Sequence, residues 1–187
     1  MIIQLFSAPN LYGKNIKWEG AIGYSSFSLR TSESKSIGFS GTSLKVGAHF
    51  HKKKKFYLGG FIEYRDLTNS YQNSVGGQEF LTAGSIGGTA GIFLDRAGQF
   101  FLELEPLVSV VYLDQIASLT EKHHTYNGAG IRLGSGYVYQ AKSISFQAGP
   151  FIEIMSLTGG KDTDYNIEVE DVIAQGLTIY LGGAYYM

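Results

Sequence analysis

Residues 99–113 read QFFLELEPLVSVVYL. Apolar side chains occupy every second position from Phe100 to Tyr112, and two glutamates lie at alternate positions between them. This two-residue period predicts a β-strand, because successive side chains of a strand point to opposite faces of the sheet. The segment is also much longer than the mean strand of about 5–6 residues in globular sheets.

The same period recurs along the chain and predicts eight long strands, at 15–29, 37–50, 55–67, 80–95, 99–113, 126–140, 143–157 and 172–187. The connections alternate in length. Those at 51–54, 96–98 and 141–142 are short, whereas those at 30–36, 68–79, 114–125 and 158–171 are long and polar. This pattern predicts an all-β fold: an eight-stranded antiparallel up-and-down barrel with turns at one end and loops at the other.

Composition excludes several classes of protein. Charged residues are 17% of the 187, below the roughly 25% that is typical of soluble domains, and the net charge of −1 argues against a nucleic-acid partner. The chain has no Cys, so disulfides, thiolate metal sites and Cys nucleophiles are absent. No phosphate-binding Gly loop or metal-binding motif is found, and we expect neither a metal nor a cofactor.

The two faces of the predicted strands differ in character. Over most of its length one face is apolar and carries no charge, as in Leu102, Ile152 and Leu181. The opposite face mixes small residues with a few ionisable ones: Lys17, Glu19, Lys45, Glu63, Arg65, Glu103, Glu105, Arg132 and Glu153.

These faces fit two architectures. In a soluble, lipocalin-like ligand-binding barrel the apolar face would point inward, and in a membrane barrel it would point outward. The sparse charges make a poor solvent surface, but they suit a narrow lumen filled by side chains and nearly neutral overall. We therefore expect the apolar face to contact lipid.

Aromatic residues on the apolar face favour the same conclusion, because they group at two heights that match the two headgroup regions of a membrane. The group near the short turns is Trp18, Phe50, Phe56, Phe100, Tyr137, Tyr139 and Tyr185. The group near the long loops is Tyr24, Tyr64, Phe80 and Tyr112.

In this pattern the chain resembles small bacterial outer-membrane barrels of the OmpA transmembrane-domain and OmpX type. Residues 176–187, GLTIYLGGAYYM, are similar to the C-terminal strand that the barrel-assembly machinery reads in that family, with Met187 where Phe is usual. The resemblance implies the outer membrane of a Gram-negative bacterium, loops extracellular and termini periplasmic. It also implies membrane lipid, lipopolysaccharide and the assembly machinery as partners.

Residues 1–14 form a predicted periplasmic segment ahead of a barrel at 15–187. The segment begins Met1-Ile2-Ile3-Gln4 and lacks the basic region of a signal peptide. We expect Met1 to stand where a removed signal ended.

The lumen residues Lys45, Glu63, Arg65, Glu103, Glu105, Arg132 and Glu153 form a predicted charge network, either a structural plug or a gated polar passage. The plug is favoured, because a lumen of eight strands is filled by side chains. The main hypothesis is therefore a non-catalytic barrel that is structural or presents its loops to an unidentified surface ligand.

The first alternative is a lipid A-modifying enzyme. Pro106 and Pro150 each remove a ladder donor, so they could form a lateral seam beside the sixth strand, of the kind that acyltransferases of the PagP type use. The segment 123–131 faintly resembles that of PagL-type deacylases, but Tyr126 stands at the position of their nucleophilic serine.

Overall fold

The computed structural model describes residues 16–30, 36–53, 55–69, 78–95, 97–117, 120–141, 143–162, 168–169 and 171–186. The predicted segment at 1–14 lies outside these ranges. The strands are β1 (Ile16–Arg30), β2 (Ser36–Lys53), β3 (Phe56–Asn69), β4 (Gln78–Phe93), β5 (Phe100–Ala117), β6 (Thr120–Ala141), β7 (Ile144–Asp162), β8 (Glu168–Val169) and β9 (Val172–Tyr186).

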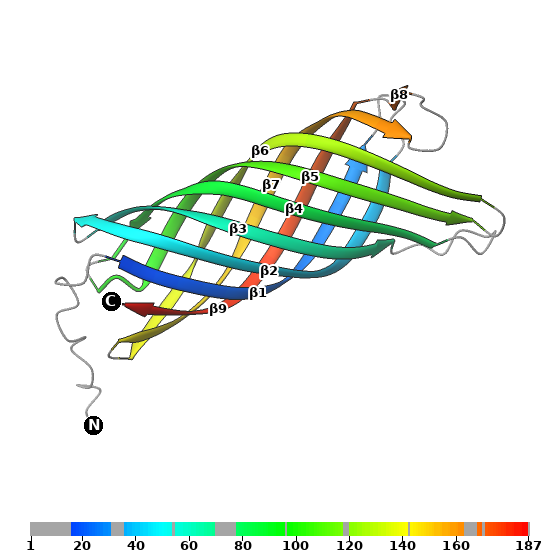
Figure 1. Ribbon diagram of the computed structural model, residues 1–187. Coiled ribbons are helices and arrows are strands. Elements are labelled where there is room, and N and C mark those ends of the chain that lie inside the picture. The colour runs from blue at the N-terminus through cyan, green and yellow to red at the C-terminus, as the bar shows by residue number, and fades with distance from the viewer. Residues whose placement is uncertain are drawn as a thin grey trace.

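Eight long strands form one closed antiparallel barrel, as the period predicted (Figure 1). Each long strand pairs with its neighbour in the chain, and the β1–β9 and β6–β7 pairings complete the ring. Among the described residues, the two-residue strand β8 pairs with the loop-end part of β7 alone. Closure leaves no free sheet edge along the barrel, which is the condition for placing strands in hydrocarbon.

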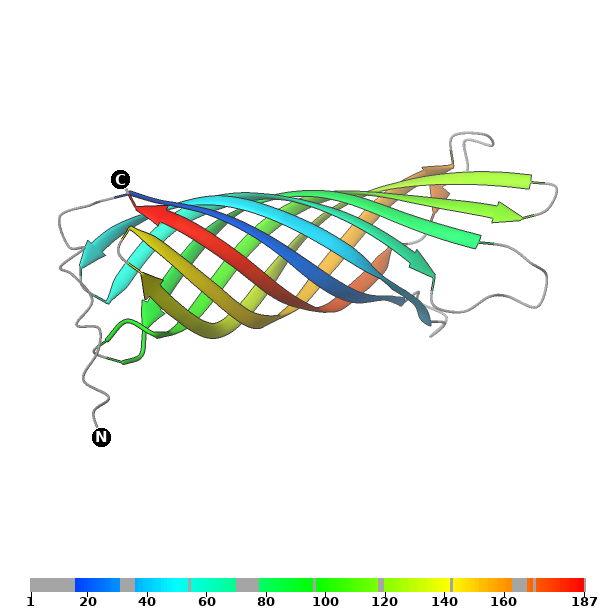
Figure 2. The same cartoon turned by 90° about the horizontal axis from the view of Figure 1, so that it is seen from below.

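The two ends of the barrel differ. β1 begins and β9 ends at the same end, where β2–β3, β4–β5 and β6–β7 are joined by the short turns (Figure 2). We call this the turn end and the opposite one the loop end. At the loop end β5 and β6 remain paired as far as Ala117 and Thr120.

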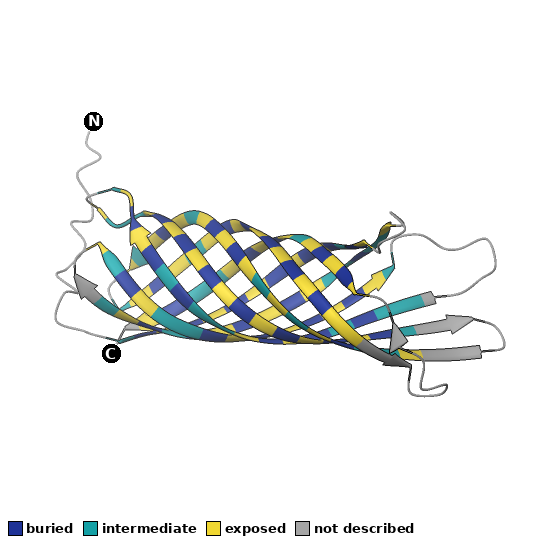
Figure 3. Cartoon of the chain, turned by 90° about the horizontal axis from the view of Figure 1, so that it is seen from above, coloured by how far each residue is buried: buried dark blue, intermediate teal, exposed yellow. Residues whose placement is uncertain are grey.

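Burial alternates along every long strand, which gives the chequered pattern in Figure 3. Ile152 and Leu181 expose 61% and 62% of their surface, whereas Glu103 and Glu153 expose 2% each. This is the opposite of a soluble barrel, in which the apolar face is buried. Among the described residues, no helix is long and apolar enough to cross a membrane.

Asp95 organises the turn between β4 and β5. Its carboxylate accepts hydrogen bonds from the backbone N–H groups of Ala97 (3.0 Å), Gln99 (2.8 Å) and Phe100 (2.8 Å). Burial acts to raise the pKa of Asp95, but these backbone donors outweigh it and hold the pKa below its usual value. The ionised carboxylate therefore stabilises the fold above the unfolded-state pKa, and this contribution is lost as the pH falls through the lower folded-state pKa.

We expect Asp95→Asn to lower the free energy of unfolding at pH 7, because the neutral amide is a weaker acceptor for the turn N–H groups. The difference from the unaltered protein should shrink as the pH falls below about 4. Urea unfolding in lipid vesicles at several pH values measures it, with Asp66→Asn on the outer wall as a control. A difference that does not change with pH would contradict the role of the charge.

The outer face generates a second prediction. Ile86 lies near the middle of β4 and is 58% exposed on the apolar surface. Ile86→Arg should destabilise the barrel in vesicles by about 2–4 kcal/mol, because a cation at the bilayer midplane loses its hydration. Ala97→Arg, at an exposed position of the turn between β4 and β5, should cost much less. Equal losses for the two variants would argue against a membrane belt at this height.

Candidate functional site

The centre of the lumen holds a network of charged side chains around Arg132, which is fully buried. Its guanidinium donates to Glu153 (2.9 Å), to Glu105 (3.2 Å) and to Glu63. These carboxylates come from β7, β5 and β3, so one side chain of β6 ties together strands on different sides of the barrel. A planar guanidinium suits this position because it presents five donors in a fixed geometry.

Arg65 makes the second centre of the network. It donates twice to Glu63, at 2.9 and 2.8 Å, and twice to Glu153, at 3.1 and 2.5 Å. Its guanidinium also lies 4.8 Å from the centre of the Phe27 ring. Glu63 and Glu153 are therefore shared between two arginines, and the buried carboxylates are matched by donors as a low-dielectric interior requires.

Lys45 and Glu103 complete the predicted set of residues. Lys45 pairs with Glu105, and its ammonium lies over the rings of Phe61 and Phe151, at 4.8 and 4.9 Å from their centres. Glu103 accepts a hydrogen bond of 2.6 Å from the Tyr57 hydroxyl. All seven predicted residues are buried inside the barrel.

Two tyrosines belong to this network although the sequence analysis did not include them. The hydroxyl of Tyr180 contacts Glu63 and accepts a hydrogen bond from Arg132 at 3.2 Å, and Tyr57 holds Glu103. Both lie in the inward phase of their strands, so the alternation could have identified them. The predicted set contains only residues that are charged at neutral pH, and tyrosine is neutral there.

An apolar layer lies in the lumen on the loop side of the charges. It contains three fully buried aliphatic side chains, those of Leu67, Leu157 and Met155, together with the aromatic ring of Phe39. The sequence analysis assigned small and charged residues to the inner face and did not foresee this layer. Near the loop end, apolar residues occupy both phases of a strand, as at 110–113, so the alternation is lost there.

A polar cluster lies on the turn side of the network. Lys17 donates to Glu19 at 3.1 Å and to Gln147 at 2.8 Å. His49 is fully buried, stacks on Tyr57 with ring centres 5.4 Å apart, and has its Nδ1 atom 3.6 Å from Glu19. The buried apolar side chains of Phe93, Phe101 and Val138 lie on the same side, so the lumen passes from a mixed layer at the turn end to a charged layer and then to an apolar one. Among the described residues, no group of three or more His, Asp and Glu is arranged to hold a metal ion.

The structure places all eleven predicted girdle residues in the outward phase of their strands. Nine of them are exposed, at 39–60%, whereas Phe56 and Phe80 are half-buried. On the outer wall Phe100 packs edge-on against Tyr137, with ring centres 5.2 Å apart.

Pro106 and Pro150 interrupt the strand pairing, but not symmetrically about β6. The β4–β5 ladder skips from Gly87–Leu107 to Ala90–Leu104, and the β6–β7 ladder skips from Gly134–Phe151 to Tyr137–Ala148. The β5–β6 and β7–β9 ladders run unbroken through the two prolines. Each proline lacks the N–H that would point to one neighbouring strand, which is β4 for Pro106 and β6 for Pro150. Of these two gaps, only the one at Pro150 therefore borders β6.

The histidine segment of β6 lies on the extension beyond the girdle. His123 Nδ1 lies 2.7 Å from Asp114 of β5, and both side chains are roughly half-exposed. Tyr126, in the position compared with a nucleophilic serine, is buried in the apolar layer.

Comparison with known proteins supports the architecture. No protein-family model matches the chain, and no curated protein matches it in sequence. Among solved structures, Neisserial surface protein A is similar with a TM-score of 0.59 and 15% identity, over 91% of this chain and 97% of that one.

Two further barrels are similar in the same way. The outer membrane protein AlkL, solved in lipid bilayers, has a TM-score of 0.58 and 13% identity over 100% of this chain and 96% of its own. Ail of Yersinia pestis has a TM-score of 0.52 and 12% identity over 93% and 99%. The chain thus has the fold of the small eight-stranded outer-membrane barrels.

The network predicts a large effect of removing its central cation. Arg132→Ala leaves three buried carboxylates short of a donor and should destabilise the protein by about 3–5 kcal/mol. Thermal or urea unfolding in detergent measures this, with exposed Asn127→Ala as the control. Arg132→Met should also be destabilised, and adding Glu105→Gln to it should recover part of the lost stability. An Arg132→Ala protein as stable as the unaltered one would rule out the network.

Proposed function

We propose that this protein is an outer-membrane barrel whose lumen is sealed by its own side chains. Its role would be structural or surface-interactive, with the loop end extracellular and the turn end periplasmic. The observation that carries the proposal is the Arg132 cluster, in which one buried cation contacts carboxylates from three other strands. Such a cluster resists ion passage, because an ion entering the lumen would have to break pairs that water cannot reach.

The apolar layer on the loop side supports the same proposal. Side chains such as Leu67 and Leu157 expose none of their surface, so they offer no hydration site to a permeating ion. A dry layer and a paired charge layer in series would act as two barriers. This arrangement favours an anchor or a display scaffold over a channel.

Conductance measurements in planar bilayers test the seal. We expect the unaltered protein to give no stable conductance steps, and Leu67→Ala with Leu157→Ala to give brief openings because a void replaces part of the dry layer. Steady open-channel steps from the unaltered protein would contradict the proposal.

The absence of cysteine makes orientation simple to test, because any introduced thiol is unique. Thr158 is exposed near the loop end, and Ala97 is exposed in a turn at the other end. In intact cells a membrane-impermeant maleimide should label Thr158→Cys and should not label Ala97→Cys. The reverse pattern would contradict the proposed orientation.

A second candidate function is lipid A modification through the wall. The pairing gaps beside Pro106 and Pro150 favour it, since a ladder without those hydrogen bonds separates more easily. The charged mid-lumen opposes it, because a bound acyl chain needs an apolar cavity. Mass spectrometry of lipid A from cells with and without the protein distinguishes the candidates: gain or loss of an acyl chain would favour the enzyme.

A further inference from the structure

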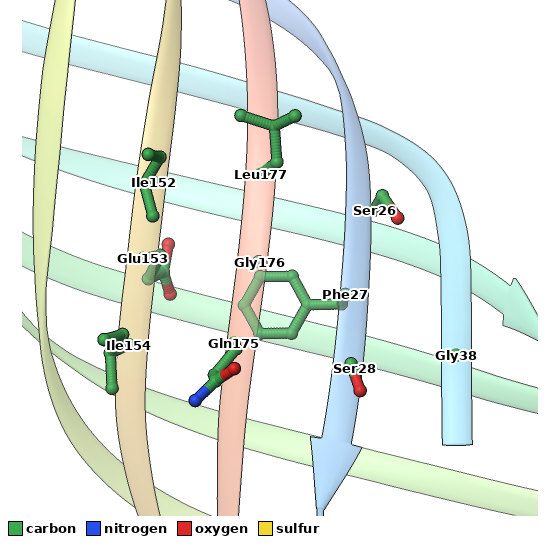
Figure 4. Close-up of a pocket in the computed structure, with 10 residues that line it drawn as sticks. All are labelled: Ser26, Phe27, Ser28, Gly38, Ile152, Glu153, Ile154, Gln175, Gly176 and Leu177. Carbon is green, nitrogen blue, oxygen red and sulfur yellow. The ribbon is translucent and has the colours of Figure 1, made fainter. Parts of the chain in front are cut away.

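The outer wall carries an open depression of about 430 Å³ on β1, β7 and β9, near the loop end (Figure 4). Two rows of outward side chains cross it in register. The first row is Ser26, Leu177 and Ile152, and the second is Ser28, Gln175 and Ile154.

The depression arises from unequal side-chain size and from a thin wall. Ser26, Ser28 and Gly38 are short on one side, whereas β7 and β9 present longer side chains on the other. At the floor Gly176 has no side chain, and the ring of Phe27 packs against it from inside. A Cβ at this glycine would lie 2.3 Å from that ring, so the floor is built from backbone.

On β1 the depression lies on the loop side of the girdle residue Tyr24, where we expect hydrocarbon to give way to headgroups. Ser26 follows the girdle residue Tyr24 by one outward position, and Ser28 follows by two. Ile152 and Leu177, at one edge of the depression, are exposed at 61% and 44%. The depression thus joins an apolar surface suited to acyl chains to a polar one suited to a headgroup.

The polar groups are mostly uncharged. The Ser26 and Ser28 hydroxyls and the Gln175 amide can both donate and accept hydrogen bonds, which matches the hydroxyl groups of a sugar. Ser28 already bonds to Ser36 at 2.5 Å, which fixes its position. The next outward residue of β1 is Arg30, an exposed cation that can pair with a phosphate.

One acidic residue lines the depression, and its charge is already matched. Glu153 projects into the lumen, where Arg65 and Arg132 donate to its carboxylate. Its carboxylate therefore does not oppose an anionic ligand whose phosphate lies at the Arg30 end.

We infer that this depression binds the headgroup of a phosphorylated glycolipid of the outer leaflet. Sugar hydroxyls contact Ser26, Ser28 and Gln175, the phosphate pairs with Arg30, and the acyl chains lie along Leu177 and Ile152. In the cell this site rests on the proposed function, since the loop end must face the outer leaflet, but binding in detergent does not depend on orientation.

Gly38→Leu tests the site. A Cβ at Gly38 meets no atom within 4 Å, so the leucine can be accommodated while it fills the depression. Gly84→Leu is the matched control, because Gly84 is also outward, also has no atom within 4 Å of an added Cβ, and lies on β4, away from the depression. Both variants add the same apolar group to the outer wall.

The probe is Kdo₂-lipid A added to the detergent-solubilised protein, with phosphatidylglycerol as an anionic lipid that lacks sugar. Native mass spectrometry gives the fraction of protein that retains each lipid. We expect selective retention of the glycolipid, about tenfold weaker binding for Gly38→Leu and for Arg30→Ala, and partial retention for Arg30→Lys. Gly84→Leu should bind as the unaltered protein does.

Equal retention of the two lipids would overturn the assignment to a glycolipid, and unchanged binding by both Gly38→Leu and Arg30→Ala would overturn the site. Neither result bears on the sealed lumen, which the conductance measurement tests separately. A conducting protein that still binds Kdo₂-lipid A at this depression would contradict the proposed function and leave the site intact.

Discussion

Hydrocarbon offers no hydrogen-bond partner to a peptide group, and the rest of this structure depends on that constraint. Strands can cross such a medium only when each strand pairs with a neighbour on both sides, so β1 must pair with β9 and β6 must pair with β7. Closure then divides each strand into a face toward lipid and a face toward the lumen. The outer face has to be apolar, and the inner face has to fill a narrow space with its own side chains.

The filling of that space divides the lumen into layers with different physical roles. Around Arg132 and Arg65, charges removed from water are tolerated because nearly every carboxylate oxygen has a donor. Directional contacts between distant strands also favour one register of the strands over registers shifted by a residue or two. The apolar layer near Leu67 adds no such direction, because its side chains make no directional polar contacts.

Two irregularities of the wall come from the backbone. Proline removes a donor, so pairing is missing beside Pro106 and Pro150. Glycine removes a side chain, so at Gly176 only the backbone separates the outer surface from the Phe27 ring. Such places on the outer surface are where we propose that a lipid is recognised.

The two-residue period predicted the eight long strands and divided their residues between two faces, because alternation is a local property of an extended chain. The sparse charges and the aromatic groups then indicated which face is outward. Together they assigned Glu103 inward and Ile152 outward, and they selected the seven lumen residues. Which of them meet was decided only by tertiary structure: Arg132 contacts Glu63, 69 positions away, with Tyr180 between them. Strand tilt and stagger determine those contacts. They also bring Ser26, Gln175 and Ile152 together in one depression. Both are properties of the closed ring that no single strand encodes.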